Sequence, residues 1–156
     1  MNMTIKAFKK NKLEKGFTLI ELLVVIGILA ILLAITLIAI NPARQFGQAN
    51  DTKRRSDITQ ILNAIGQYSA SNGGNLPAGI TLVSQTIDST NTPALCTDLV
   101  PNYIPALPAD PTLNNQAGIS TCTGTWNTGY SIIKDANNRI TVSATGYNNT
   151  SITVTR

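Results

Sequence analysis

Hydrophobic positions along the chain fall into three patterns. Residues 17–40 form one almost unbroken apolar run, FTLIELLVVIGILAILLAITLIAI, with no charge after Glu21. Between residues 43 and 74, apolar residues recur every three or four positions, which is the period of one helix face. From residue 128 onward they alternate with polar residues, which is the period of a half-buried strand. The patterning therefore predicts an apolar helix, an amphipathic helix and a small sheet.

The apolar run has the length of a membrane span. Its 24 residues would extend about 36 Å as a helix, enough to cross a hydrocarbon core of roughly 30 Å. Pro42 follows the run, and we expect a kink or break there because proline lacks an N–H and clashes with the preceding helical turn. We therefore assign residues 17–42 to a transmembrane helix.

Residues 43–74 are predicted to form the amphipathic helix, which Gly73 and Gly74 bring to an end. Spacings of four residues predict ion pairs between Asp51 and Arg55 and between Lys53 and Asp57. The basic cluster at residues 53–55 is interpreted as a solvated, ion-paired face in preference to a nucleic-acid site. The apolar stripe that we expect to face the core comprises Ile58, Ile61, Leu62, Ile65 and Tyr68.

The end of the chain predicts a three-stranded antiparallel meander within residues 128–156. Its strands are expected at residues 130–134, 139–145 and 151–155, separated by Asn-rich turns. Alternate apolar residues on these strands would pack against the stripe of the amphipathic helix. Residues 75–127 form a long connecting region to which the pattern assigns no strand or helix. The predicted fold class is α+β.

Charge is concentrated at the start of the chain. The first 16 residues contain five lysines and one acid, which accounts for the entire formal net charge of +4. Because the remaining charges balance, the high isoelectric point does not indicate a nucleic-acid-binding protein. A basic segment before an apolar helix instead predicts a cytoplasmic N-terminus, with the chain after the helix outside.

The titratable residues argue against an enzyme. The chain has no His, and residues 75–156 contain just four acids, Asp88, Asp98, Asp110 and Asp135, which are widely spaced. We therefore predict no catalytic residue, no cofactor and no metal. Cys96 and Cys122 lack the spacing of a redox pair and lie in a region expected outside the cell, so we expect them to form one disulfide.

Glu21 is the exceptional residue of the apolar run. An acid inside a membrane helix costs a few kcal/mol unless it finds a partner, which makes it a functional candidate. No basic residue lies on the same helix. A partner would have to come from the preceding lysines, a lipid head group, or an α-amino group on a neighbouring subunit.

The sequence Lys15-Gly16-Phe17-Thr18-Leu19-Ile20-Glu21, followed by the long apolar run, resembles the prepilin signature of type IV pilins and pseudopilins. The resemblance implies that residues 1–16 are a leader, that a prepilin peptidase cuts between Gly16 and Phe17, and that the new Phe17 amine is methylated. It also implies the lollipop architecture of pilins, a long helix packed on a small antiparallel head.

The function implied is that of a subunit that polymerises through its N-terminal helix into a type IV pilus for adhesion, motility or DNA uptake. Its partners would be other pilin subunits, the peptidase, the assembly machinery and the membrane. In the filament, Glu21 of one subunit would pair with the Phe17 amine of the next. The chain would be anchored in the inner or cytoplasmic membrane by a single span and become extracellular after assembly.

Two alternatives remain open. The first is a pseudopilin of a type II secretion or competence system, since residues 103–111 partly resemble a pseudopilin loop that can hold calcium. Asp110 is the single acid there, so a structural turn is favoured over a calcium site. The second is a membrane-anchored binding module that does not polymerise.

Overall fold

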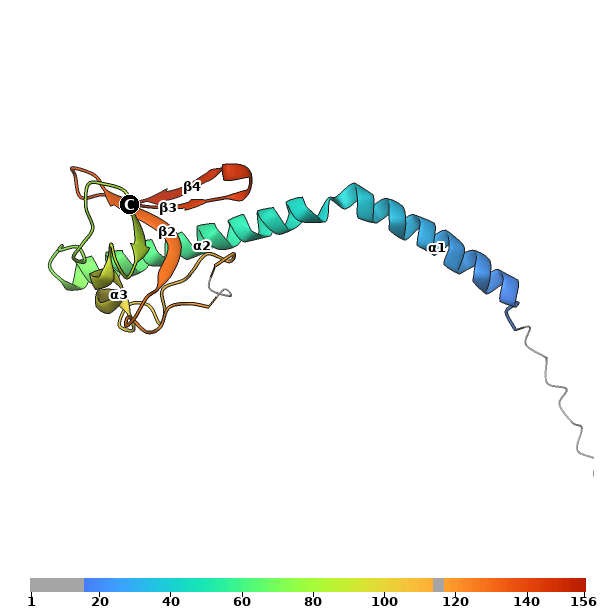
Figure 1. The fold of residues 1–156 in the computed structure, drawn as a ribbon, viewed down its shortest axis with the longest axis horizontal. Helices are drawn as coiled ribbons and strands as arrows, with labels where there is room; N and C mark the ends of the chain where they lie inside the picture. The colour runs from blue at the N-terminus through green and yellow to red at the C-terminus, as the bar shows by residue number, and fades with distance from the viewer. Residues whose placement is uncertain (1–15, 114–116) are drawn as a thin grey trace, which may run out of the picture. The chain divides into compact units, whose positions relative to one another are not determined.

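The computed structural model describes residues 16–113 and 117–156 of the chain. They divide into two compact units, the first ending at Asn41 and the second running from Pro42 to Arg156. The described part of the first unit contains one helix, α1 (Leu19–Ile40). The second unit begins with α2 (Pro42–Ser71) and contains all the strands (Figure 1).

The boundary between the two helices lies at Asn41. This residue has a left-handed backbone conformation, with φ 47° and ψ 80°, and ends α1. A residue before proline is disfavoured in the right-handed helical region, whereas proline is well suited to the first helical position, where its missing N–H has no partner to lose. The Asn41-Pro42 step is thus a complete helix break rather than a proline inside a continuous helix.

The second unit combines α2 with a four-stranded antiparallel sheet. The strands are β1 (Gln85–Asp88), β2 (Asn127–Lys134), β3 (Ile140–Thr145) and β4 (Ser151–Thr155), and they lie in the order β1-β2-β3-β4. A short helix, α3 (Pro93–Leu99), follows β1, and a 3₁₀ turn, η2 (Tyr147–Asn149), joins β3 to β4. The predicted α+β class is confirmed.

The core lies between α2 and the sheet. The predicted helix stripe is buried, with Ile58 and Ile61 having no exposed surface and Tyr68 partly buried at its end. β3 and β4 both pack against α2. The strand residues that join the stripe in one cluster are Ile140, Val142, Ala144 and Ile152, with Val154 partly buried beside them.

The connecting region contains more regular structure than predicted. β1 adds a fourth strand beside β2, and α3 supplies Leu95, Cys96 and Leu99 to the core. Both elements are too short to establish a helical or strand period, at four and seven residues. Cys96 of α3 is joined to Cys122 by a disulfide.

Candidate processing and assembly site

The first turn of α1 is organised by Thr18 and Glu21. Thr18 is the N-cap residue, and its Oγ1 accepts a hydrogen bond from the Glu21 backbone N–H at 3.3 Å. In return, Glu21 Oε2 accepts from the Thr18 backbone N–H at 2.8 Å and from Thr18 Oγ1–H at 2.7 Å. This reciprocal arrangement is a capping box, which satisfies two N–H groups that a helix start leaves unpaired.

The capping box gives Glu21 a role that the sequence analysis missed. The signal was present, because Thr18-Leu19-Ile20-Glu21 has the Thr-x-x-Glu spacing of that motif. The carboxylate also lies at the positive end of the helix dipole, where a negative charge is favourable. Its partners in the box are nevertheless neutral donors, so the hydrogen bonds position the charge of Glu21 without neutralising it.

Gly16 and Phe17 precede this cap in non-helical backbone. The Phe17 side chain is 84% exposed, and a Cβ added at Gly16 would meet no atom within 4 Å. Among the described residues, no other part of the chain covers Gly16 or Phe17. Residues 1–15, which hold the predicted lysine-rich leader, lie outside the described residues.

The remainder of α1 has no polar face. Its 22 residues have a mean hydropathy of 3.3 over the most apolar window, and none of them is buried within the chain. At 1.5 Å per residue the helix is about 33 Å long, sufficient to cross a bilayer core. A helix that is apolar all round requires cover from lipid or from other helices. By length and composition, α1 could cross a membrane.

In the second unit, the basic cluster of α2 is not the solvated face that we predicted. Arg54 is only 7% exposed, and its guanidinium forms a two-pronged ion pair with Asp110, through Nε at 2.6 Å and Nη2 at 3.0 Å. Asp51 pairs with Arg54 at 3.0 Å in place of Arg55. The other predicted pair is confirmed, with Lys53 Nζ 2.9 Å from Asp57. Spacing along one helix could not reveal Asp110, which belongs to a loop 56 residues away.

The Asp110 carboxylate is fully engaged by protein groups. Besides Arg54, it accepts hydrogen bonds from the Thr112 N–H at 2.8 Å and the Thr112 hydroxyl at 2.6 Å. Burial alone would raise the pKa of Asp110, but the bonds from Arg54 and Thr112 outweigh burial and hold that pKa below its ordinary value. A calcium ion at Asp110 would need several acidic oxygens around it, but the group beside this carboxylate is the positively charged guanidinium of Arg54. Among the described residues, no three His, Cys, Asp or Glu side chains form a group suited to a metal.

Two further polar contacts, one buried and one partly buried, tie α2 to the sheet and its last turn. The Tyr130 hydroxyl donates to Asp57 at 2.9 Å, and burial together with this bond raises the pKa of Tyr130. Asp51 accepts the backbone N–H of Tyr147 at 2.8 Å, which fixes the turn between β3 and β4 above the start of α2. Asp51, Asp57 and Asp110 therefore all form contacts that hold the head together.

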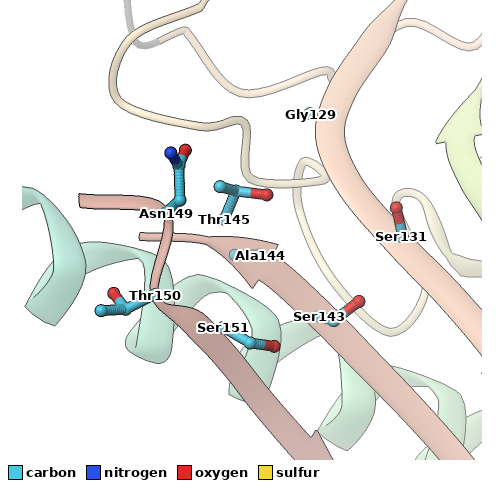
Figure 2. Close-up of a pocket in the computed structure, with 8 residues that line it drawn as sticks. All are labelled: Gly129, Ser131, Ser143, Ala144, Thr145, Asn149, Thr150 and Ser151. Atoms are coloured by element: carbon cyan, nitrogen blue, oxygen red, sulfur yellow. The ribbon is translucent and has the colours of Figure 1, made fainter. Parts of the chain in front are cut away.

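A small hollow opens on the sheet where two strands separate. The ladder between β2 and β3 ends at Ser131 and Ser143, whereas that between β3 and β4 continues to Thr145 and Ser151 (Figure 2). The lining residues are Gly129, Ser131, Ser143, Ala144, Thr145, Asn149, Thr150 and Ser151. The lining has serine and threonine hydroxyls, but it includes no acid, base or thiol that could activate one of them as a nucleophile.

Comparison with known protein families finds a match at the N-terminal end of the chain. Residues 11–37 match the family model described as the prokaryotic N-terminal methylation motif. The match spans Gly16, Phe17, Thr18 and Glu21 and most of α1. No curated protein and no solved structure shows significant similarity to the chain.

Proposed function

We propose that this chain, which carries the N-terminal methylation motif of type IV pilin signal peptides, is a pilin precursor whose mature form polymerises through α1 into a type IV pilus. The observation that carries the proposal is the coincidence of that motif with a capped, membrane-length helix that buries none of its apolar surface in its own chain. The motif points to a structural subunit and not to an enzyme family. The filament would serve adhesion, motility or DNA uptake.

Processing would occur at the accessible bond before the cap. A prepilin peptidase would remove residues 1–16 and leave a new α-amino group on Phe17, which is then methylated. This amine would lie at the positive end of its own helix dipole, where a cation is disfavoured. The Glu21 carboxylate of the same chain is held by the capping box on the donors of Thr18, so the acid that compensates for this amine would come from a neighbouring subunit.

Assembly would use the same two charges. In the membrane, Glu21 without a cation is costly, and a filament in which it meets the Phe17 amine of a neighbouring subunit removes that cost. The pairing would fix the axial register between subunits, while the apolar surfaces of neighbouring helices cover one another. The head would lie outside the membrane before assembly and on the filament surface afterwards.

The second candidate is a pseudopilin of a secretion or competence system. Its motivation was the loop at residues 103–111, but Asp110 in that loop is held by Arg54 rather than grouped with other acids. The loop therefore gives no support for the pseudopilin over the pilus subunit. A non-polymerising anchored module is the third candidate, and the same experiment separates all three.

The first test is intact-mass analysis of the chain in filaments sheared from producing cells, compared with the membrane fraction. A methylated chain beginning at Phe17 and abundant in the sheared fraction is expected. A processed chain confined to membranes would indicate a pseudopilin. A chain still beginning at Met1 would overturn the precursor proposal.

The second test replaces Glu21 with Gln, which keeps the size of the side chain and removes its charge. We expect normal membrane insertion and processing but at least a tenfold loss of filaments in the sheared fraction. Thr36→Val is the matched control, because Thr36 is also polar in α1 but its hydroxyl is bonded locally to the Leu33 carbonyl at 2.9 Å. Equal filament yields from Glu21→Gln and Thr36→Val would contradict the charge-pair model.

A further inference from the structure

The two edges of the sheet differ in how they are protected. β1, at one edge, has four residues, carries Asp88 and has an irregular register with β2. β4, at the other edge, has five residues in continuous register with β3, and its sequence Ser-Ile-Thr-Val-Thr contains no charge and no proline. Proteins normally guard edge strands with charges, prolines, bulges or shortness, because an exposed edge pairs readily with another strand. β4 lacks these protections.

The hydrogen-bond pattern shows which groups of β4 face outward. Ile140 and Arg156 exchange both backbone bonds, at 2.8 and 2.9 Å, and Gly146 N–H donates to the Thr150 carbonyl at 2.7 Å. Bonded positions alternate in an antiparallel ladder, so the even-numbered residues of β4 are bonded to β3.

The odd-numbered residues Ser151, Thr153 and Thr155 therefore direct their N–H and C=O groups away from the sheet. Within residues 16–113 and 117–156, no other segment is hydrogen-bonded to these backbone groups, and all three residues are exposed. A strand placed against them would complete three bonded pairs.

We propose that β4 pairs antiparallel with β4 of a second copy of this chain, centred on Thr153, to form one continuous eight-stranded sheet. In this register Thr153 lies opposite Thr153 of the partner subunit, and Ser151 lies opposite Thr155 of the partner subunit. The three bonded pairs would contribute six backbone hydrogen bonds.

Charge and packing favour a second copy as the occupant. The strand is uncharged, so self-pairing brings no like charges together, and the antiparallel register separates the two Arg156 side chains to opposite ends. Val154 is half-buried at the margin of the core, next to Ile152. In the paired sheet, Val154 would lie beside Ile152 of the partner subunit, and the core-facing apolar row would continue across the junction.

A five-residue strand buries less surface than the roughly 1,000 Å² needed by a stable isolated dimer. The contact is therefore weak between single chains and strong where many copies are held in a row. Its two-fold symmetry cannot relate subunits that all point the same way along one filament. If the proposed function holds, the contact joins neighbouring filaments side by side.

The register is tested with the full-length chain in detergent, carrying single cysteine substitutions under mild oxidation. Thr153→Cys should form a disulfide-linked dimer, because bonded pairs have Cα atoms about 5.5 Å apart, within disulfide reach. Ser151→Cys and Thr155→Cys should each fail alone, since like residues would be about 14 Å apart, but should cross-link when mixed. Association through α1 would cross-link all three variants alike or none, and either result overturns the proposal.

Thr153→Pro supplies an independent test. Proline removes the outward N–H of residue 153 and leaves the bonds between β4 and β3 in place, as edge positions allow. We expect unchanged thermal unfolding and at least a fivefold loss of the mixed Ser151→Cys and Thr155→Cys cross-link when both chains also carry Thr153→Pro. Undiminished cross-linking would overturn the pairing. These readouts do not depend on processing or filament formation, so they fail or succeed separately from the proposed function.

Discussion

The buried ion pair between Arg54 and Asp110 offers the sharpest test of how the head is held together. Replacing Arg54 with Met keeps an unbranched apolar side chain on α2 but leaves the Asp110 carboxylate, whose side chain is 9% exposed, without its cation. Removing one partner of a buried pair costs about 3–5 kcal/mol. Since Thr112 still donates two hydrogen bonds to Asp110, we expect the lower end, about 3 kcal/mol, or a fall in Tm of about 10 °C.

A double-mutant cycle separates the pair from the packing around it. Replacing both partners with apolar residues, Arg54→Met with Asp110→Leu, removes the unpaired charge, and such replacements are often neutral. The double variant should therefore be about 2 kcal/mol more stable than Arg54→Met alone. The assay is thermal unfolding of the full chain in detergent, followed by near-ultraviolet circular dichroism. A double variant whose loss equals the sum of the single losses would refute the reasoning.

The same pair has a pH signature with a defined sign. The pKa of Asp110 is lower in the folded chain than in an unfolded one, so the folded state binds its proton less readily. Its contribution to stability is present above the unfolded pKa of about 3.9 and is lost as the pH falls through the folded pKa. Asp110→Asn should flatten that part of the acid-unfolding curve. A variant curve parallel to that of the wild type below pH ~4 would contradict this assignment.

Three further predictions use the same unfolding assay. Replacing both Cys96 and Cys122 with Ala should cost about 3.5 kcal/mol on the chain-entropy model for cysteines 26 residues apart, and an unchanged Tm would exclude a stabilising role for the disulfide. Tyr130→Phe should cost about 1–2 kcal/mol, because Asp57 loses a buried donor and keeps Lys53; a loss below about 0.5 kcal/mol would show that water replaces the hydroxyl. Gly47→Ala should cost about 1–3 kcal/mol, since its Cβ would clash with the Tyr147 ring. Gly66→Ala, whose Cβ meets only Arg156 Nη1 at 3.8 Å, is the matched control and should be neutral or stabilising.

The parts of the fold that were predictable are those with a long or regular pattern. The apolar run predicted α1 to within two residues at each end, and the strand alternation located β3 and β4 with at most a one-residue difference. β1 and α3 were missed because four and seven residues contain too few repeats to define a period. Their positions depend on contacts with β2 and α2, which are separated from them in sequence.

The polar contacts also differ in whether local spacing or the tertiary fold brings their residues together. Thr18 and Glu21 are three residues apart, so their cap follows from local spacing and could have been read from the sequence. Arg54 and Asp110 are brought together only by the tertiary fold. Three consecutive basic residues on a helix gave no sign that the middle one, Arg54, points into the protein while Arg55 stays exposed. The four-residue spacing predicted Arg55 as the partner of Asp51, whereas the observed partner is Arg54. The Arg54 side chain points into the protein because it pairs with Asp110 there.

The two units differ in whether their charged and apolar groups are satisfied within the chain. The second unit satisfies its buried charges internally: Arg54 is paired with two acids, and Asp57 with Lys53 and Tyr130. In the described part of the first unit, by contrast, the apolar surface and the charge are not satisfied within the chain. α1 buries no side chain, and Glu21 has only the neutral donors of Thr18. An apolar helix and a carboxylate that are not satisfied within their own chain need other molecules to satisfy them. Residues 11–37, which match the family model of the N-terminal methylation motif, include most of this helix.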